Sequence, residues 1–100
     1  MNIIMVRYKV KPEHVGENEA ALKEVFANIE REQPAGIHYA SFKLADGVSF
    51  VALVHLEEGA TPLTENPYFQ KFQANLMEIV DGQPAQEVLE SVGTYNFLDE

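Results

Sequence analysis

Two histidines are the side chains best suited to acid–base chemistry in this 100-residue chain. His38 and His55 lie in two strand-like runs that are joined by Asp46-Gly47, a dipeptide typical of a two-residue type I′ hairpin turn. Such a turn places residue 38 opposite residue 55, with both imidazoles on one face. Because the ordinary pKa of histidine lies near neutrality, the sequence predicts His55 or His38 as a catalytic base.

The same pair of imidazoles has two other interpretations. Facing histidines could bind a transition metal, but a metal usually needs a third protein ligand, and none is evident from the spacing. A cross-strand pair near the strand ends can also be ordinary polar surface. We therefore predict no metal site.

Aromatic residues suggest a second kind of site, one that binds a small aromatic ligand. Tyr8 follows the alternation of a strand's core face, and Tyr68 and Phe72 lie on the apolar side of a helical segment. A phenol at each wall would orient an aromatic ligand, and Gln73 could add a hydrogen bond. We predict Tyr8, Tyr68, Phe72 and Gln73 as substrate-binding residues that share a cleft with His55. The alternative, that the aromatic side chains only fill the core, stays open.

The elements that would position these residues follow from periodicity and turn signals. Alternating β-branched residues predict strands, apolar residues at spacings of three and four predict helices, and Pro and Gly mark their ends. The predicted order is βαββαβ, which gives a ferredoxin-like α+β plait with a four-stranded antiparallel sheet and two helices on one face. The expected segments are strands at 3–11, 36–45, 48–57 and 86–97 and helices at 17–33 and 66–80.

The strand at 48–57 is apolar on both of its faces. Phe50 and Val54 alternate with Val51 and Leu53. Two helices can cover only one face of the sheet, so the other face would expose an apolar patch larger than monomers usually carry. The sequence therefore predicts a homodimer in which two sheets pack against each other.

Composition limits the classes of function. The length fits one domain, residues 1–100, and 46% hydrophobic residues can build a core without disulfides, because the chain has no cysteine. A net charge of −9 disfavours binding to nucleic acid or to a membrane surface. No signal peptide and no long apolar run are visible, so we expect a cytoplasmic protein.

Three short motifs resemble the antibiotic biosynthesis monooxygenase-like family of dimeric α/β barrels. They are Val10-Lys11-Pro12 at the end of the first strand, Pro34-Ala35-Gly36-Ile37-His38-Tyr39 before the second, and Asn66-Pro67-Tyr68-Phe69-Gln70-Lys71-Phe72 in the second helix. The resemblance spans the chain from its first strand to its last. It implies the ferredoxin-like plait and the sheet-to-sheet homodimer.

The resemblance also implies two candidate functions. One is an oxygenase without a cofactor that acts on a phenolic or enolisable substrate; the other is a non-catalytic dimeric module that binds a small ligand. Haem degraders of this family are disfavoured, because Val6, Leu63 and Gln73 lie where those enzymes have a polar residue, a tryptophan and a haem-binding histidine.

Overall fold

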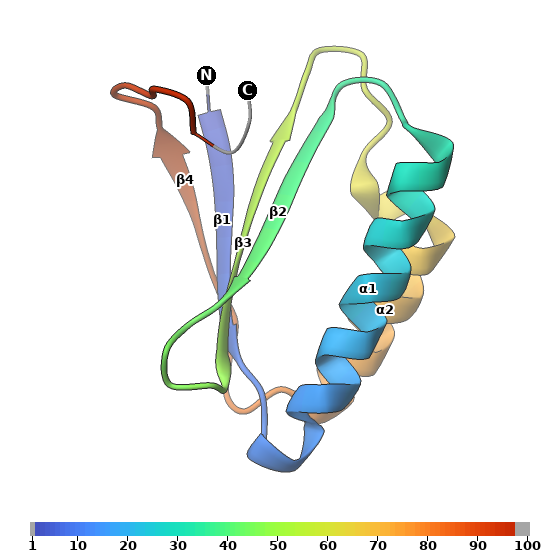
Figure 1. The fold of residues 1–100 in the computed structure, drawn as a ribbon, viewed down its shortest axis with the longest axis vertical. Coiled ribbons are helices and arrows are strands. Elements are labelled where there is room, and N and C mark those ends of the chain that lie inside the picture. Colours follow the sequence, from blue (N-terminus) through green and yellow to red (C-terminus); the bar gives the residue numbers. More distant parts are fainter. Residues whose placement is uncertain (1, 98–100) are drawn as a thin grey trace.

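The computed structural model describes residues 2–97 and shows one four-stranded antiparallel sheet with two helices on the same side (Figure 1). The strand order is β2-β3-β1-β4. This arrangement confirms the predicted ferredoxin-like α+β fold. The elements are β1 (Asn2–Lys9), η1 (Pro12–His14), α1 (Val15–Glu32), β2 (Ile37–Lys43), β3 (Ser49–Leu56), η2 (Leu63–Glu65), α2 (Pro67–Ile79) and β4 (Ala85–Glu90).

Helix α2 begins where the sequence predicts, at Asn66-Pro67. The Asn66 side chain accepts hydrogen bonds from the backbone N–H groups of Tyr68 and Phe69, at 2.9 and 3.0 Å, and Pro67 occupies the first turn. The Asn66 amide also donates to Oδ1 of Asn28 in α1, at 2.8 Å. One side chain therefore caps α2 and fixes its start against α1.

The hairpin of β2 and β3 has the predicted register but not the predicted turn. Residue 38 pairs with residue 55, as expected. A type I′ turn needs positive φ at both central residues, whereas Gly47 (φ 78°) has it and Asp46 does not. Instead, the Gly47 N–H donates to the Leu44 carbonyl, and the Asp46 carboxylate accepts from the backbone N–H groups of Val48 and Ser49. The predicted two-residue turn is therefore wrong, because the aspartate side chain closes a wider turn.

The last strand is shorter than the predicted 86–97. It ends at Glu90, whose partner is Asn2 at the start of β1. Within the described residues, this pair is the last of the ladder between β1 and β4. Tyr95 and Phe97, expected within the strand, consequently lie outside it, and both are exposed.

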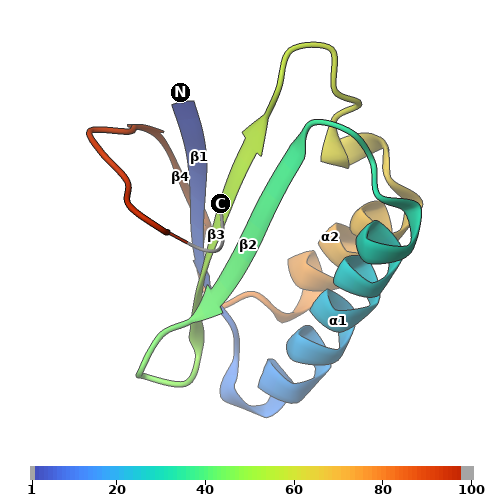
Figure 2. The same cartoon turned by 45° about the horizontal axis from the view of Figure 1, so that its top comes forward.

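The core lies between the sheet and the helices, which face each other in the ribbon views (Figure 2). Tyr8 of β1 and Phe50 of β3 are cross-strand partners whose rings stack with centroids 5.4 Å apart. The buried residues of the core cluster are Tyr8, Val10, Leu22, Val25, Phe50, Phe72 and Ile79.

Neither helix of the described chain has the length and hydrophobicity that crossing a bilayer requires.

Candidate functional site

The strand register decides which predicted site residues share a surface. Side chains of paired residues project to the same face, and successive residues alternate between faces. Tyr8 and Phe50 are paired and buried against the helices. His55 differs from Phe50 by an odd number of positions, so it projects from the opposite face, which no helix covers. We call this uncovered surface the open face, and we call the surface that packs against the helices the covered face.

The two histidines do meet, on the open face. Their ring centroids are 5.6 Å apart, and the Nε2 atom of His38 lies 2.7 Å from Oε2 of Glu57. Both partners of that ion pair are more exposed than buried. The cross-strand pairing of imidazoles is as predicted. Between residues 2 and 97 there is no cluster of three or more His, Cys, Asp or Glu side chains that could hold a metal.

On the covered face, Tyr8 forms a buried polar pair with Asn18 of α1. The Asn18 side chain is fully buried, and its Nδ2 donates to the Tyr8 hydroxyl at 3.1 Å. Its Oδ1 is also buried and has no hydrogen-bond partner. Burial raises the pKa of Tyr8, against the smaller opposite effect of the Asn18 hydrogen bond, so the phenol stays protonated.

Sequence reasoning missed Asn18, although a signal was present. The residue stands at the start of the apolar stripe formed by Leu22, Val25 and Ile29, at spacings of four, three and four. A polar residue on that stripe must be buried when the helix docks on the sheet. Such a residue needs a hydrogen-bond partner or a function.

Tyr39 of β2 is a second phenol on the covered face, and it is half-buried. Its ring stacks on Phe26 of α1, with centroids 4.7 Å apart, and meets the edge of Phe69 of α2 at 6.0 Å. Burial raises the pKa of Tyr39 strongly, and the neighbouring Tyr8 raises it further. The covered face therefore holds neutral phenols in an aromatic setting.

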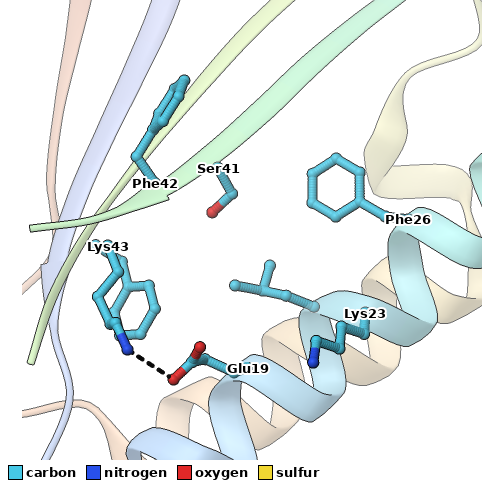
Figure 3. Close-up of a pocket in the computed structure, with 8 residues that line it drawn as sticks. Glu19, Lys23, Phe26, Ser41, Phe42 and Lys43 are labelled. Atoms are coloured by element: carbon cyan, nitrogen blue, oxygen red, sulfur yellow. Dashed lines mark hydrogen bonds and ion pairs between the residues drawn. The ribbon is translucent and has the colours of Figure 1, made fainter. Parts of the chain in front are cut away.

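A hollow of about 220 Å³ opens between α1 and the edge strand β2 (Figure 3). Its polar interior atom is Oγ of Ser41, which is buried and has no hydrogen-bond partner. At the rim, Nζ of Lys43 lies 3.1 Å from Oε2 of Glu19. Phe42 projects away from the hollow in the close-up, in agreement with its pairing on the open face. The lining residues are Glu19, Leu22, Lys23, Phe26, Ser41, Phe42, Lys43 and Phe50.

Tyr68 and Phe72 line a different hollow, of about 260 Å³, in the groove between α1 and α2. Phe72 reaches the core, whereas Tyr68 is 41% exposed. Gln73 is exposed and does not line this groove. Phe69, one position further around the helix than Tyr68, is the residue that turns toward the sheet.

The predicted site residues are therefore distributed over separate regions of the described chain, and Gln73 is exposed outside all of them. Tyr8 and Phe72 lie in the core, Tyr68 lies in the groove between the helices, and His38 and His55 lie on the open face. A cleft that contains Tyr8, Tyr68 and His55 together does not form within one chain. The hollow beside Ser41 combines apolar walls, a free hydroxyl and nearby charge, so it is the candidate functional site.

Several solved structures share this fold. One, described as an antibiotic biosynthesis monooxygenase, has a TM-score of 0.76 and 14% identity, over 93% of this chain and 100% of that chain. Rv0793 from Mycobacterium tuberculosis has a TM-score of 0.73 and 16% identity, over 93% of this chain and 96% of that chain. A variant of SnoaB, a cofactor-independent oxygenase from Streptomyces nogalater, has a TM-score of 0.68 and 18% identity, over 93% of this chain and 94% of that chain.

These similarities confirm the fold that the sequence motifs implied. Neither a protein-family model nor a curated protein matches the sequence. At identities below 20%, the three structures establish a shared architecture and leave the reaction to the residues of this chain.

Proposed function

We propose that this chain is an oxygenase that works without a prosthetic group on a small phenolic or enolisable substrate bound between α1 and β2. The observation that carries the proposal is the hollow in which Leu22, Phe26 and Phe50 surround the unpartnered Ser41 hydroxyl. The fold shared with a cofactor-independent oxygenase supports the same reaction class.

In this reaction the substrate supplies the electrons. Loss of the phenol proton gives a phenolate, and a ring carbon then transfers two electrons to dioxygen as a C–O bond forms. The peroxide takes up a proton, its O–O bond breaks, and water leaves as the ring carbon loses its hydrogen. A phenol and dioxygen thereby become a quinone and water, so no additional reductant is required. The protein contributes orientation, exclusion of water and a base.

The residues around the hollow have complementary roles in this proposal. Ser41 hydrogen-bonds the substrate oxygen and stabilises the developing phenolate at that end of the ring. Among the lining residues, Glu19 carries the one carboxylate, which can act as a general base. We therefore assign it as the base.

The histidines remain a second candidate for the base. His38 and His55 could act only on a substrate bound at the open face, and their stacking beside Glu57 favours that alternative. Turnover that survives Glu19→Gln but is lost in His55→Gln would favour the histidines.

The proposal includes a homodimer in which the open faces of two sheets pack together. That face carries apolar side chains on β1, β2 and β3, including Met5, Phe42, Val51 and Leu53. Their burial by a second copy would remove an exposed patch of a kind rare in monomers. Sedimentation equilibrium should give about twice 11.2 kDa. Leu53→Glu should yield a monomer, and a wild-type monomer at micromolar concentration would refute the dimer.

Oxygen uptake tests the catalytic function. The pure protein is mixed with a panel of phenols, quinols and flavonoids in an oxygen electrode, with Ser41→Ala as the test variant and the exposed Ser91→Ala as its control. Ser41→Ala should lower kcat/KM by roughly tenfold or more, as loss of one hydrogen bond to a charged group does. Binding without uptake by any substrate would instead indicate the alternative, a non-catalytic dimeric ligand-binding module.

A further inference from the structure

We infer that the ligand of the α1–β2 hollow is a single-ring phenol that carries a carboxylate, and that Lys43 binds this carboxylate after it displaces Glu19. The inference rests on the proposed function for the phenol and on the local charges for the acid. It therefore narrows the substrate from phenols in general to acidic ones of small size.

The dimensions of the hollow limit the ligand to about one ring. Its volume of about 220 Å³ is below the range of roughly 300 to 1,000 Å³ that holds drug-sized ligands. Phe26 and Phe50 supply aromatic walls, and Leu22 supplies an aliphatic one. An aromatic ring of one cycle fits such walls, whereas a polycyclic ligand would extend into solvent.

The Ser41 hydroxyl gives the ring an orientation. Its Oγ is buried and unpartnered, and in the close-up it points from β2 toward α1, into the hollow (Figure 3). A buried hydroxyl without a partner is unfavourable, so a ligand that supplies a hydrogen bond gains affinity there. A phenolic oxygen placed at Ser41 directs the opposite end of the ring toward Lys43 at the rim, and the displaced Glu19 carboxylate is then free to turn toward the phenol and accept its proton.

The rim carries positive charge in a protein that is otherwise strongly acidic. Lys23 and Lys43 face a single carboxylate, Glu19, around this hollow, although the net charge of the chain is −9. The Lys43–Glu19 pair is partly exposed on both sides, so exchanging one carboxylate for another is inexpensive. A bound carboxylate gains a charge-assisted hydrogen bond to the Lys43 ammonium.

The groove between the helices provides an internal contrast with the opposite charge balance. There Lys71 faces two carboxylates, Glu17 and Glu24, and its Nζ lies 4.0 Å from the nearest Glu24 oxygen. An anionic ligand would be repelled in that groove. The sign of the local charge therefore distinguishes the two hollows on either side of α1, and it makes Lys71 a matched control for Lys43.

The test compares the binding of 4-hydroxybenzoate with that of its neutral analogue 4-hydroxybenzamide, by calorimetry at low ionic strength. The acid should bind at least tenfold more tightly, and Lys43→Gln should abolish that preference while Lys71→Gln preserves it. Glu19→Gln should strengthen binding of the acid several-fold without affecting the amide, whereas Glu24→Gln should change neither. Amide NMR shifts on binding should centre on Ser41.

Equal affinity for acid and amide, an equal effect of the two lysine variants, or shifts centred on Tyr68 would overturn the inference. The same ligands in the oxygen electrode separate it from the proposed function. Acid-selective binding without oxygen uptake refutes the oxygenase and leaves the acidic-ligand site intact. Uptake with neutral phenols and no preference for the acid refutes the acidic ligand alone.

Discussion

The two faces of the sheet both carry many apolar residues, but they differ in whether their polar groups are buried or exposed. On the covered face, Tyr8 and the Ser41 oxygen are buried beside α1, Tyr39 is half-buried, and the Ser41 oxygen has no partner. On the open face, His38 and Glu57 are exposed and pair with each other. The covered face thus holds unsatisfied polar atoms in an apolar setting, which is the combination that a ligand completes.

The difference indicates that the two faces need different partners: a ligand on the covered face and a second copy of the chain on the open face. Unsatisfied buried atoms reduce stability, so their retention points to binding or catalysis. Apolar atoms on the open face are favourable to cover but need a second copy to do so. The alternation of residues along the strands therefore gives a covered face suited to ligand binding and an open face suited to dimerisation.

The largest expected effect comes from truncating one phenylalanine on each face. Phe50→Ala should lower the free energy of unfolding by roughly 3 to 5 kcal/mol, because its ring is 1% exposed and stacks on Tyr8. Phe42→Ala should change it by less than about 1 kcal/mol in a monomeric sample, because that ring is 39% exposed. Urea unfolding measures both values. Similar losses in dilute solution would contradict the distinction between the two faces.

The next effect concerns the buried pair of Asn18 and Tyr8. Asn18→Leu leaves the Tyr8 hydroxyl without its donor, and Tyr8→Phe leaves the Asn18 amide without its acceptor, so each should destabilise by about 1 to 3 kcal/mol. The double variant removes both polar groups and should be close to neutral. A thermodynamic cycle from urea unfolding tests this. If the double variant loses the sum of the two single losses, the pair is not energetically coupled.

The elements of this fold could be predicted because each depends on near neighbours in the sequence. Asn66-Pro67 caps α2 through its own next two residues, and the pairing of His38 with His55 depends on one hairpin. The predicted turn failed because the side-chain contacts of Asp46 outweighed the conformational preference of the dipeptide.

The site could be predicted less well because it depends on contacts between distant segments. Which face carries the histidines follows from the pairing of Tyr8 with Phe50, and no local pattern encodes that register. The exposure of Tyr68 depends on how α2 packs against α1 and the sheet, with Phe69 and Phe72 turned inward. Ser41 becomes notable only when α1 covers it.

High pH should weaken the covered face through Tyr39. Burial raises its pKa above the ordinary 10.0, so the unfolded chain gives up that proton more readily than the folded one. The stabilising contribution is complete below pH 10 and declines as the pH rises further. Tyr39→Phe should make the unfolding free energy less dependent on pH in this range, as thermal melts at several pH values can show. An unchanged pH dependence would mean that the phenol is not shielded in the folded chain.

The smallest expected effect lies at the β2–β3 turn, which supports both faces equally. The Asp46 carboxylate accepts hydrogen bonds from two backbone N–H groups and from the Ser49 hydroxyl at 2.6 Å, and these lower its pKa from 3.8 to about 2. Because the folded pKa is depressed, the contribution is present above about pH 4 and is lost as the pH falls toward 2.

Asp46→Ala should therefore lower the melting temperature slightly at pH 6, and the difference from wild type should shrink as the pH falls to 2.5. Asp46→Asn keeps an oxygen acceptor, so its melting temperature at pH 6 should lie between those of the wild type and Asp46→Ala. Because this turn joins the strands that carry Ser41 on one face and Phe42 on the other, the substitution should weaken ligand binding and dimerisation to the same small degree. A selective loss of either property would show that the turn orients one face more than the other.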